Sequence, residues 1–269
     1  MLAVSSNSKL GKEYLSPSRI NTFFNCPRNY YYHYVLGLQS KPSIHLYRGS
    51  LVHQLIDDLF ALKDCSSPNK FLKAELKKRW NPSAEGIVLS VDDNKKFYKD
   101  TEQMLNLFAR RVADKVKAVL LSGKAHSKIH AWNFAKPRLS EHHLINEEHK
   151  VHGIIDSVEK DFDDRVFIVD YKTSTLYKNV VNEDYVRQLR IYSLLYLKEF
   201  GRLPTYAAIH YLRYGEIYLF AVTQDMIDKA VEDISFVRKY TQSTQMSDYP
   251  KCDKAFCDHH YFEDEGIKI

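Results

Sequence analysis

The sequence has few cysteines and no long apolar run. Four cysteines in 269 residues are too few for a disulfide framework, so we expect a reducing, cytoplasmic setting. No stretch approaches the roughly 18 consecutive apolar residues that a membrane-spanning helix requires. The segment from Met1 to Leu15 is polar and lacks the apolar core of a secretory signal peptide. These absences argue against membrane and secreted proteins.

The net charge is also small. Lysine and arginine number 39 against 34 acidic residues, which gives +5, and the isoelectric point is 8.8. Nucleic-acid-binding domains typically lie above roughly 9. The sequence does contain apolar material, 44% of its residues, which is enough for a sizeable core and excludes a disordered chain.

The length allows one large domain or two small ones, at about 150 residues per domain. No internal repeat, linker or shift in composition divides the chain. We therefore predict a flexible N-terminal tail over residues 1–14 and a single domain over residues 15–269.

The charge is distributed unevenly along the chain. Between Asn106 and Arg138, eight basic residues are opposed by a single acidic one, Asp114, whereas the last eighteen residues hold five acidic residues and two lysines. A second basic run lies at residues 70–79. Such clustering is typical of a surface that binds a phosphate backbone, and also of an ordinary solvated helix face. Chemistry elsewhere in the chain must decide between these interpretations.

Hydrophobic periodicity and turn signals predict helices first, then strands, then an alternation of the two. The expected helices are residues 18–35, 48–62, 70–80, 92–121 and 182–200, and a last helix that starts at 223 or 225 and reaches about 240. The expected strands are residues 143–151, 152–159, 165–171, 206–214 and 216–222. This order favours one α/β domain with a helical N-terminal elaboration.

The clearest chemistry lies on two neighbouring predicted strands. Residues two apart on a strand face the same side, so Asp170 and Lys172 project together. Asp156 lies on the adjacent strand, which the polar turn at residues 160–164 brings alongside. Two carboxylates that converge with a lysine can hold a divalent cation and a phosphate. A surface hairpin is the alternative, but Asp170 and Lys172 end an apolar strand, where polar groups need partners.

Further candidates lie on the predicted helices. His53 borders an apolar face, with Ile56 and Phe60 three and seven residues later, and alone it is more typical of a packed core histidine than of a ligand. Gln188 and Tyr192 are four residues apart, hence on one helical face. Alone they are typical of a solvated amide and a packing residue.

Five motifs occur in order along the chain. They are residues 15–31, Gly49-Ser-Leu-Val-His53, Gly153-Ile-Ile-Asp156, Asp170-Tyr-Lys172 and Gln188-Leu-Arg-Ile-Tyr192. Together they resemble the RecB-type branch of the PD-(D/E)XK nuclease superfamily, which includes the nuclease domains of RecB and AddB and the CRISPR-associated RecB-like exonucleases. The resemblance spans about residues 15–257. It implies a restriction-endonuclease-like core, in which helices flank a mixed central sheet.

The resemblance also implies a metal centre. Lys172, Asp170 and Asp156 would be the catalytic residues. The metal ligands for Mg²⁺ or Mn²⁺ would be His53, Asp156, Asp170 and the backbone carbonyl of Tyr171. An imidazole among oxygen ligands suits Mn²⁺ well.

The implied substrate is DNA. Gln188 and Tyr192 would steady the active site and the nucleic-acid strand, and Arg110 and Arg111 of the basic segment would guide it. We expect a divalent-metal-dependent DNA nuclease, an exonuclease on single-stranded DNA or DNA ends, in recombination, repair or CRISPR adaptation. A non-catalytic DNA-binding subunit and a small-molecule hydrolase are the alternatives. No GxxxxGK[ST] motif is present, so a helicase or CRISPR adaptation proteins would be separate partners.

Some members of this branch hold a [4Fe-4S] cluster with one N-terminal and three C-terminal cysteines. Cys26 matches the first position, and Cys252 and Cys257 match part of the second set. Four thiolates are usual for such a cluster, so this ligand set is incomplete. A histidine at position 259 or 260 could complete it, Cys65 could be recruited, or the cluster could be lost.

Overall fold

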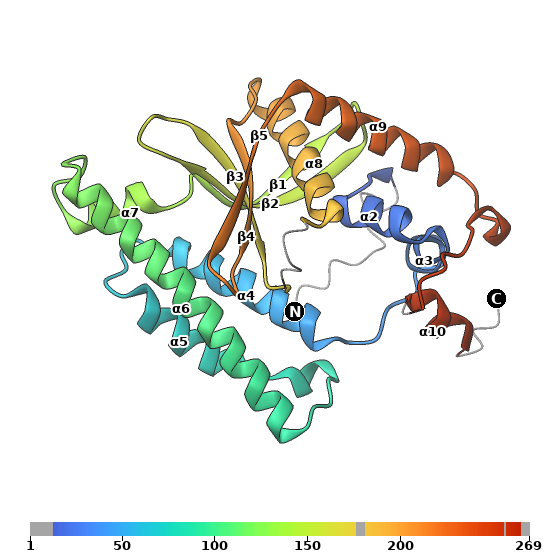
Figure 1. The fold of residues 1–269 in the computed structure, drawn as a ribbon, viewed down its shortest axis with the longest axis horizontal. Coiled ribbons are helices and arrows are strands. Elements are labelled where there is room, and N and C mark those ends of the chain that lie inside the picture. Colours follow the sequence, from blue (N-terminus) through green and yellow to red (C-terminus); the bar gives the residue numbers. More distant parts are fainter. Residues whose placement is uncertain (1–12, 176–180, 256, 265–269) are drawn as a thin grey trace.

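The computed structural model describes residues 13–175, 181–255 and 257–264, which form a central sheet with helices on both faces (Figure 1). The strands are β1 (Leu139–Asn146), β2 (Val151–Lys160), β3 (Val166–Lys172), β4 (Tyr206–Tyr211) and β5 (Glu216–Ala221). The helices are α2 (Pro17–Asn25), α3 (Pro27–Tyr30), a π-helical turn (Tyr31–Val35), α4 (Ile44–Ala61), α5 (Pro68–Arg79), α6 (Val91–Leu121), α7 (Lys128–Ala135), α8 (Glu183–Phe200), α9 (Gln224–Tyr240) and α10 (Asp258–Asp264). Short 3-10 turns lie at Pro82–Glu85 and Met246–Asp248.

The sheet is mixed, as predicted. Its strand order is β1-β2-β3-β4-β5, and neighbouring strands are antiparallel except for the parallel pair β3 and β4. A parallel pair needs a crossover connection, and α8 lies in the segment that joins β3 to β4. The register pairs Asp170 with Ile209 and Lys172 with Tyr211 at the carboxyl end of β3. The fold class predicted from the sequence is confirmed.

Two apolar layers enclose the sheet. On one face α8 crosses β1 to β4, and α2 and α9 pack against α8. Its core includes Ile155, Ile168 and Leu194. On the other face, residues of α4, α5, α6 and α7 bury Val169 and Tyr171 of β3. Alternate residues of β3 therefore face different helical layers, and the polar residues at its end lie between them.

Polar caps set most helix starts. At the start of five helices, a serine hydroxyl accepts a hydrogen bond from a backbone N–H of the first turn. These serines are Ser16, Ser43, Ser67, Ser90 and Ser127. Asn182 and Thr223 act in the same way for α8 and α9. Each cap satisfies a backbone N–H that has no partner within the helix. These caps explain why the predicted starts of α6, α8 and α9 lie close to the observed ones.

The single helix predicted over residues 18–35 is wrong. The chain breaks at Cys26, whose extended backbone (φ −164°, ψ 106°) separates α2 from α3. Pro27 causes the break, because the ring of a proline disfavours helical geometry in the residue before it. The break matters for the cysteine group described below, because it turns the Cys26 side chain out of the helical register.

The predicted boundary between the first two strands is also wrong. The sequence places it between Val151 and His152, whereas the turn lies at residues 147–150 and β1 begins at Leu139. Helices α7 and α10 are not predicted from the sequence, since eight and seven residues are too short to show a clear period.

The N-terminal boundary stays a prediction in part. Residues 1–12 of the expected tail lie outside the described residues. Tyr14, also within that tail, is buried and donates a hydrogen bond to Glu147. Among the helices of the described residues, none combines the length and the apolar content needed to cross a membrane.

Candidate active site

The acidic centre lies where β2 and β3 separate. The last paired residues of these strands are Ser157 and Val169, so Asp156, the neighbour of Ser157, lies just beyond the end of the ladder. The Oδ2 atom of Asp156 accepts the backbone N–H of Tyr171 at 2.7 Å. The carboxylate therefore supplies an acceptor where the ladder ends, which fixes its position against β3.

A change of alternation on β1 and β2 brings a second carboxylate to this point. Ile155 and Val158 are three residues apart, yet both are buried in the core beneath α8. On β1, the pairing with β2 skips Glu141, whose φ is +45°. Such an irregularity redirects side chains that a regular strand would send to alternate faces. The register on both sides places Glu141 opposite Asp156, and the carboxylates of both residues approach the same imidazole, that of His53.

Asp170 and Lys172 form a buried ion pair at the end of β3. The Lys172 Nζ atom lies 2.8 Å from Oδ2 of Asp170, and the Asp170 side chain is 1% exposed. Burial, reinforced by Asp156, raises the pKa of Asp170 to about 6, although Lys172 opposes the shift. Burial lowers the pKa of Lys172, but Asp170 and Asp156 outweigh it and the net shift is upward. The lysine is therefore held in its charged form.

Gln188 and Tyr192 of α8 extend the Asp170–Lys172 pair into a chain of hydrogen bonds. Lys172 Nζ donates to Oε1 of Gln188 at 2.8 Å, and Nε2 of Gln188 donates to the hydroxyl of Tyr192 at 2.7 Å. The ring of Tyr185 lies 4.5 Å from the same ammonium. The Tyr192 ring packs directly over Gly153 of β2, where a Cβ atom would lie 2.9 Å from the ring. The motifs of β2, β3 and α8 are thus in contact.

His53 reaches the site from α4. Its Nε2 atom lies 3.0 Å from the backbone carbonyl oxygen of Tyr171, and its Nδ1 atom lies 3.3 Å from Oδ1 of Asp156 and 3.6 Å from Oε1 of Glu141. A carbonyl only accepts, so Nε2 carries a proton. Burial opposes the charged form, but the carboxylates raise the pKa of His53 well above its ordinary value. Asp156 shows the reciprocal effect, since burial raises its pKa but His53 lowers it further.

These side chains fit a divalent cation. His53, Glu141 and Asp156 place one ligand atom each within 4.8 Å of one another. Asp170 lies outside that group and its buried Oδ2 is paired with Lys172 Nζ at 2.8 Å, but a carboxylate has further lone pairs that a cation could use. Carboxylates with one imidazole are a ligand set that suits Mg²⁺ and Mn²⁺. The Tyr171 carbonyl, also a predicted ligand, borders the same group.

Glu141 is absent from the residues predicted from the sequence. It lies inside β1, belongs to none of the five motifs and is preceded and followed by polar residues. Its left-handed backbone, which carries its carboxylate to His53, has no signature in the sequence.

Arg48 of α4 is a second residue that the sequence did not reveal. It is 2% exposed and donates from Nη2 to the carbonyl of Thr173, while Nε and Nη1 have no hydrogen-bond partner among the described residues. With Thr173 and Tyr185 it lines a cavity of about 330 Å³. Tyr185 also contacts Lys172, so this cavity and the Asp170–Lys172 pair share one side chain.

Arg110 and Arg111 lie elsewhere. Both are exposed on α6 and line a different cavity, of about 700 Å³, together with Lys115 and Glu159. No described contact joins them to Asp170 or Lys172. Within the basic segment Lys115 forms an ion pair with Glu159 at 2.8 Å, so part of its charge is neutralised within the fold.

The predicted cysteine ligands come together from the opposite ends of the described chain. Cys26, Cys252, Cys257 and His259 place their donor atoms within 4.8 Å of one another. Cys65 does not belong to this group and packs beside the apolar cluster of α4, α5 and α6. Of the alternatives open in the sequence, the histidine at position 259 is the one that lies in place.

Comparison with known proteins gives three findings. The sequence matches the family model of the PD-(D/E)XK nuclease superfamily over residues 14–259. Three Streptococcus agalactiae proteins, each named as a subunit of an ATP-dependent helicase/deoxyribonuclease, are 25% identical over 163 residues, which cover 60% of this chain and 14% of theirs. The chain thus spans a small part of the length of these relatives. A solved structure of an exonuclease candidate from Eubacterium rectale shares the fold, with a TM-score of 0.54 and 13% identity over 100% of this chain and 99% of that one.

Proposed function

Because the chain belongs to the PD-(D/E)XK nuclease superfamily, we propose that it is a divalent-metal-dependent DNA nuclease, an exonuclease on single-stranded DNA or DNA ends. The convergence of Asp156, Asp170, Lys172 and His53 at the end of β3 carries the proposal. Burying charges is costly unless they are paired, and groups with strongly shifted pKa values in such a setting are typical of active sites. A protein of this fold that catalysed no reaction would have no physical need for these buried, paired charges.

The carboxylates and the imidazole would hold the metal. Asp156, Glu141 and His53 would provide ligand atoms, Asp170 would add a carboxylate oxygen beside its pair with Lys172, and the backbone N–H of Tyr171 orients Asp156. When bound, a divalent cation neutralises phosphoryl oxygens and lowers the pKa of its water. Metal binding requires a neutral imidazole and ionised carboxylates, so His53 must release a proton as the metal enters.

The lysine would act on the phosphate. Asp170 keeps the Lys172 ammonium charged, and Gln188 fixes its direction through a hydrogen bond that Tyr192 extends. A preorganised cation aimed at the reacting phosphate stabilises the negative charge that develops in the transition state, or positions the attacking water. Arg48 would add a contact to a neighbouring phosphate of the strand.

The basic residues of α6 would guide the strand. Arg110 and Arg111 are exposed, and cationic side chains of this kind give salt-dependent affinity for a phosphate backbone. The Streptococcus agalactiae relatives are named as subunits of an ATP-dependent helicase/deoxyribonuclease. From that likeness we propose a separate helicase as partner and a cytoplasmic role in recombination or repair, with CRISPR adaptation as the alternative setting.

Cleavage of end-labelled single- and double-stranded DNA tests this function. We expect digestion from the labelled ends with Mg²⁺ or Mn²⁺ and none with EDTA. Lys172→Ala and Asp170→Ala should each slow cleavage by at least about a hundredfold, because each removes a charge that acts on the reacting phosphate or its metal. Affinity for single-stranded DNA, measured by fluorescence anisotropy in EDTA, should stay within a few fold of the unmodified chain.

Lys198→Ala is the matched control. This lysine also belongs to the α8 layer, but it forms an exposed pair with Glu148, and such pairs contribute little. It should retain full activity. Equal metal-dependent digestion by Lys172→Ala would contradict the proposal. DNA binding without cleavage in any metal would instead support a non-catalytic DNA-binding subunit.

A further inference from the structure

A second group of metal-binding side chains joins the N-terminal helices to α10. We propose that Cys26, Cys252, Cys257 and His259 bind a single tetrahedral zinc ion instead of an iron–sulfur cluster. This inference rests on the geometry of the four side chains and is independent of the proposed nuclease function.

The donor distances match a single ion. Sγ of Cys26 lies 3.6 Å from Nδ1 of His259, and Sγ of Cys252 lies 4.0 Å from the same nitrogen. Zinc binds sulfur at about 2.3 Å and nitrogen at about 2.0 Å, so tetrahedral geometry separates a sulfur from a nitrogen by about 3.5 Å. Three cysteines and one histidine form one of the common ligand sets of structural zinc sites.

A four-iron cluster fits this group poorly. Such a cluster normally takes four thiolates, each on a different iron, and the group offers three. Thiolates on different irons also lie farther apart than donors around one ion, whereas here all donor atoms lie within 4.8 Å of one another. Cys65, the remaining cysteine of the sequence, packs in a different apolar cluster.

The ligand set is complete, as a structural metal site requires, with two of its side chains buried and two, Cys252 and Cys257, half-buried. Cys26 and His259 are each 1% exposed. Four protein ligands leave no position for a substrate or water on a tetrahedral ion. The extended backbone at Cys26, which Pro27 imposes, lets its side chain leave the helical register and face α10.

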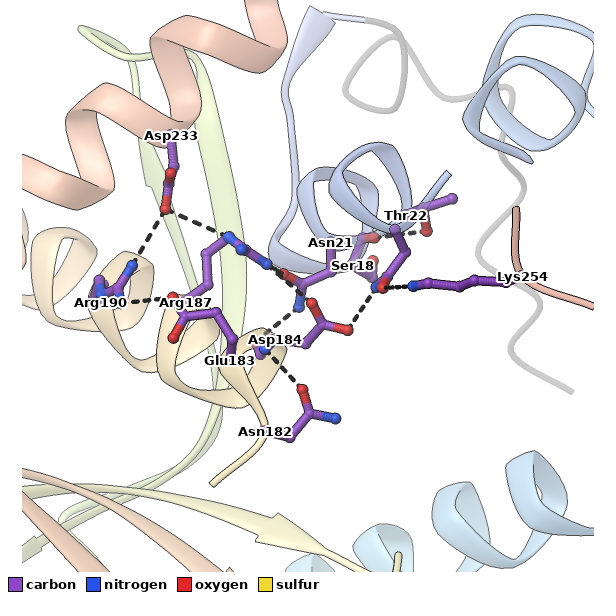
Figure 2. A network of polar contacts seen from close by, with 11 residues as sticks. Ser18, Asn21, Thr22, Asn182, Glu183, Asp184, Arg187, Arg190, Asp233 and Lys254 are labelled. Carbon is purple, nitrogen blue, oxygen red and sulfur yellow. Dashed lines mark hydrogen bonds and ion pairs between the residues drawn. The ribbon is translucent and has the colours of Figure 1, made fainter. Parts of the chain in front are cut away.

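Polar contacts beside the group connect it to the helix that carries Gln188 (Figure 2). Lys254, which lies between the two C-terminal cysteines, donates to Oδ1 of Asn25 at 2.7 Å. Asn25 donates to Asp184 at 2.6 Å, and Asp184 accepts from Arg187 at 2.9 Å. A zinc ion that holds the segment around Lys254 would therefore also support the first turn of α8.

Metal analysis of the full chain tests the proposal. The protein is expressed with zinc and iron in the medium and purified without oxygen. We expect about one zinc per chain and no acid-labile sulfide. Exchange for Co²⁺ should give visible ligand-field bands of tetrahedral coordination together with sulfur-to-cobalt charge transfer. The sulfur signal distinguishes this site from the sulfur-free group of His53, Glu141 and Asp156.

Two cysteine variants form a matched pair. Cys257→Ser should weaken zinc binding more than about tenfold, since even loss of an outer-sphere partner of a metal ligand commonly costs that much. Cys65→Ser should retain zinc in full, because Cys65 lies outside the group. If Cys257→Ser does not fold, the Co²⁺ spectrum of the unmodified chain decides the question.

Any of the following results would overturn the inference. The first is about four irons with a matching amount of sulfide per chain, which would establish an iron–sulfur cluster. The second is a chain with neither metal at stoichiometric amounts. The third is a Co²⁺ spectrum without sulfur ligation, or equal zinc content in the Cys257→Ser and Cys65→Ser variants.

Discussion

Replacing Gly153 by alanine tests how closely β2 packs beneath α8. A Cβ atom at this position would lie 2.9 Å from Cε1 of Tyr192 and 3.1 Å from Cδ1 of Leu195. Both separations are shorter than ordinary van der Waals contact, and both neighbours are buried. Either the Tyr192 ring must move or the strand and helix must separate.

The expected loss of stability is moderate. Inserting a methyl group into a packed core costs about 1–3 kcal/mol, whereas replacing glycine restricts the unfolded chain and returns about 0.4–1 kcal/mol. The free energy of unfolding should therefore fall by about 1–2 kcal/mol. Displacing Tyr192 should also loosen its hydrogen bond with Gln188, which orients Lys172, so cleavage should slow more than stability alone explains.

Urea unfolding followed by circular dichroism measures the change, with Gly49→Ala as the control. Gly49 lies inside α4, where a Cβ atom would meet only Oγ1 of Thr173 at 3.6 Å, an ordinary contact. Alanine there should raise stability by about 0.5–1 kcal/mol through helix propensity. A Gly153→Ala variant as stable as the unmodified chain, or a Gly49→Ala variant that loses as much stability, would contradict this close packing. Combined with Tyr192→Leu, which removes the ring, the loss from Gly153→Ala should be less than additive.

Two further perturbations follow from the buried polar groups. Burial lowers the pKa of His210 to about 3, so below about pH 6.5 the unfolded chain binds a proton at this residue that the folded chain does not. The contribution of His210 to the free energy of unfolding is therefore retained above that pH and should fall by about 2 kcal/mol on going to pH 5, whereas Asp170 and His53, whose pKa values are raised, act in the opposite direction. The His210→Gln variant should lose most of this fall when the free energy of unfolding is measured by urea titration at both pH values. An unchanged dependence of that free energy on pH would contradict the assignment. Mn²⁺ at a hundred times its dissociation constant should raise the free energy of unfolding by about 2.7 kcal/mol in calorimetry, and Asp156→Ala should abolish the gain. An equal gain in that variant would place the ion elsewhere.

Periodicity predicted the sheet well because β3 is short, apolar and bounded by polar turns. The alternation along Val166–Lys172 correctly placed Asp170 and Lys172 on one side, and the four-residue spacing placed Gln188 beside Tyr192. These relations are local, so the sequence alone is sufficient to predict them.

Non-local relations were not predictable in the same way. The approach of Glu141 to His53 depends on a left-handed residue within β1, and no composition signal marks it. The identity of the fourth residue beside the cysteines depends on α10, which is too short for periodicity to reveal. The break at Cys26, in contrast, could have been predicted, because Pro27 stands in the sequence.

The contact between Cys26 and the segment before α10 also constrains when the fold can close during synthesis. More than 220 residues separate Cys26 from Cys252, whereas His53, Asp156, Lys172 and Tyr192 all precede that segment. Synthesis runs from the N-terminus, so the residues of the sheet and α8 leave the ribosome while the thiol of Cys26 still lacks its partners. Translation thus makes the active-site residues available first, and the layer that joins α2 and α3 to α10 can form only after residues 252–259 have emerged.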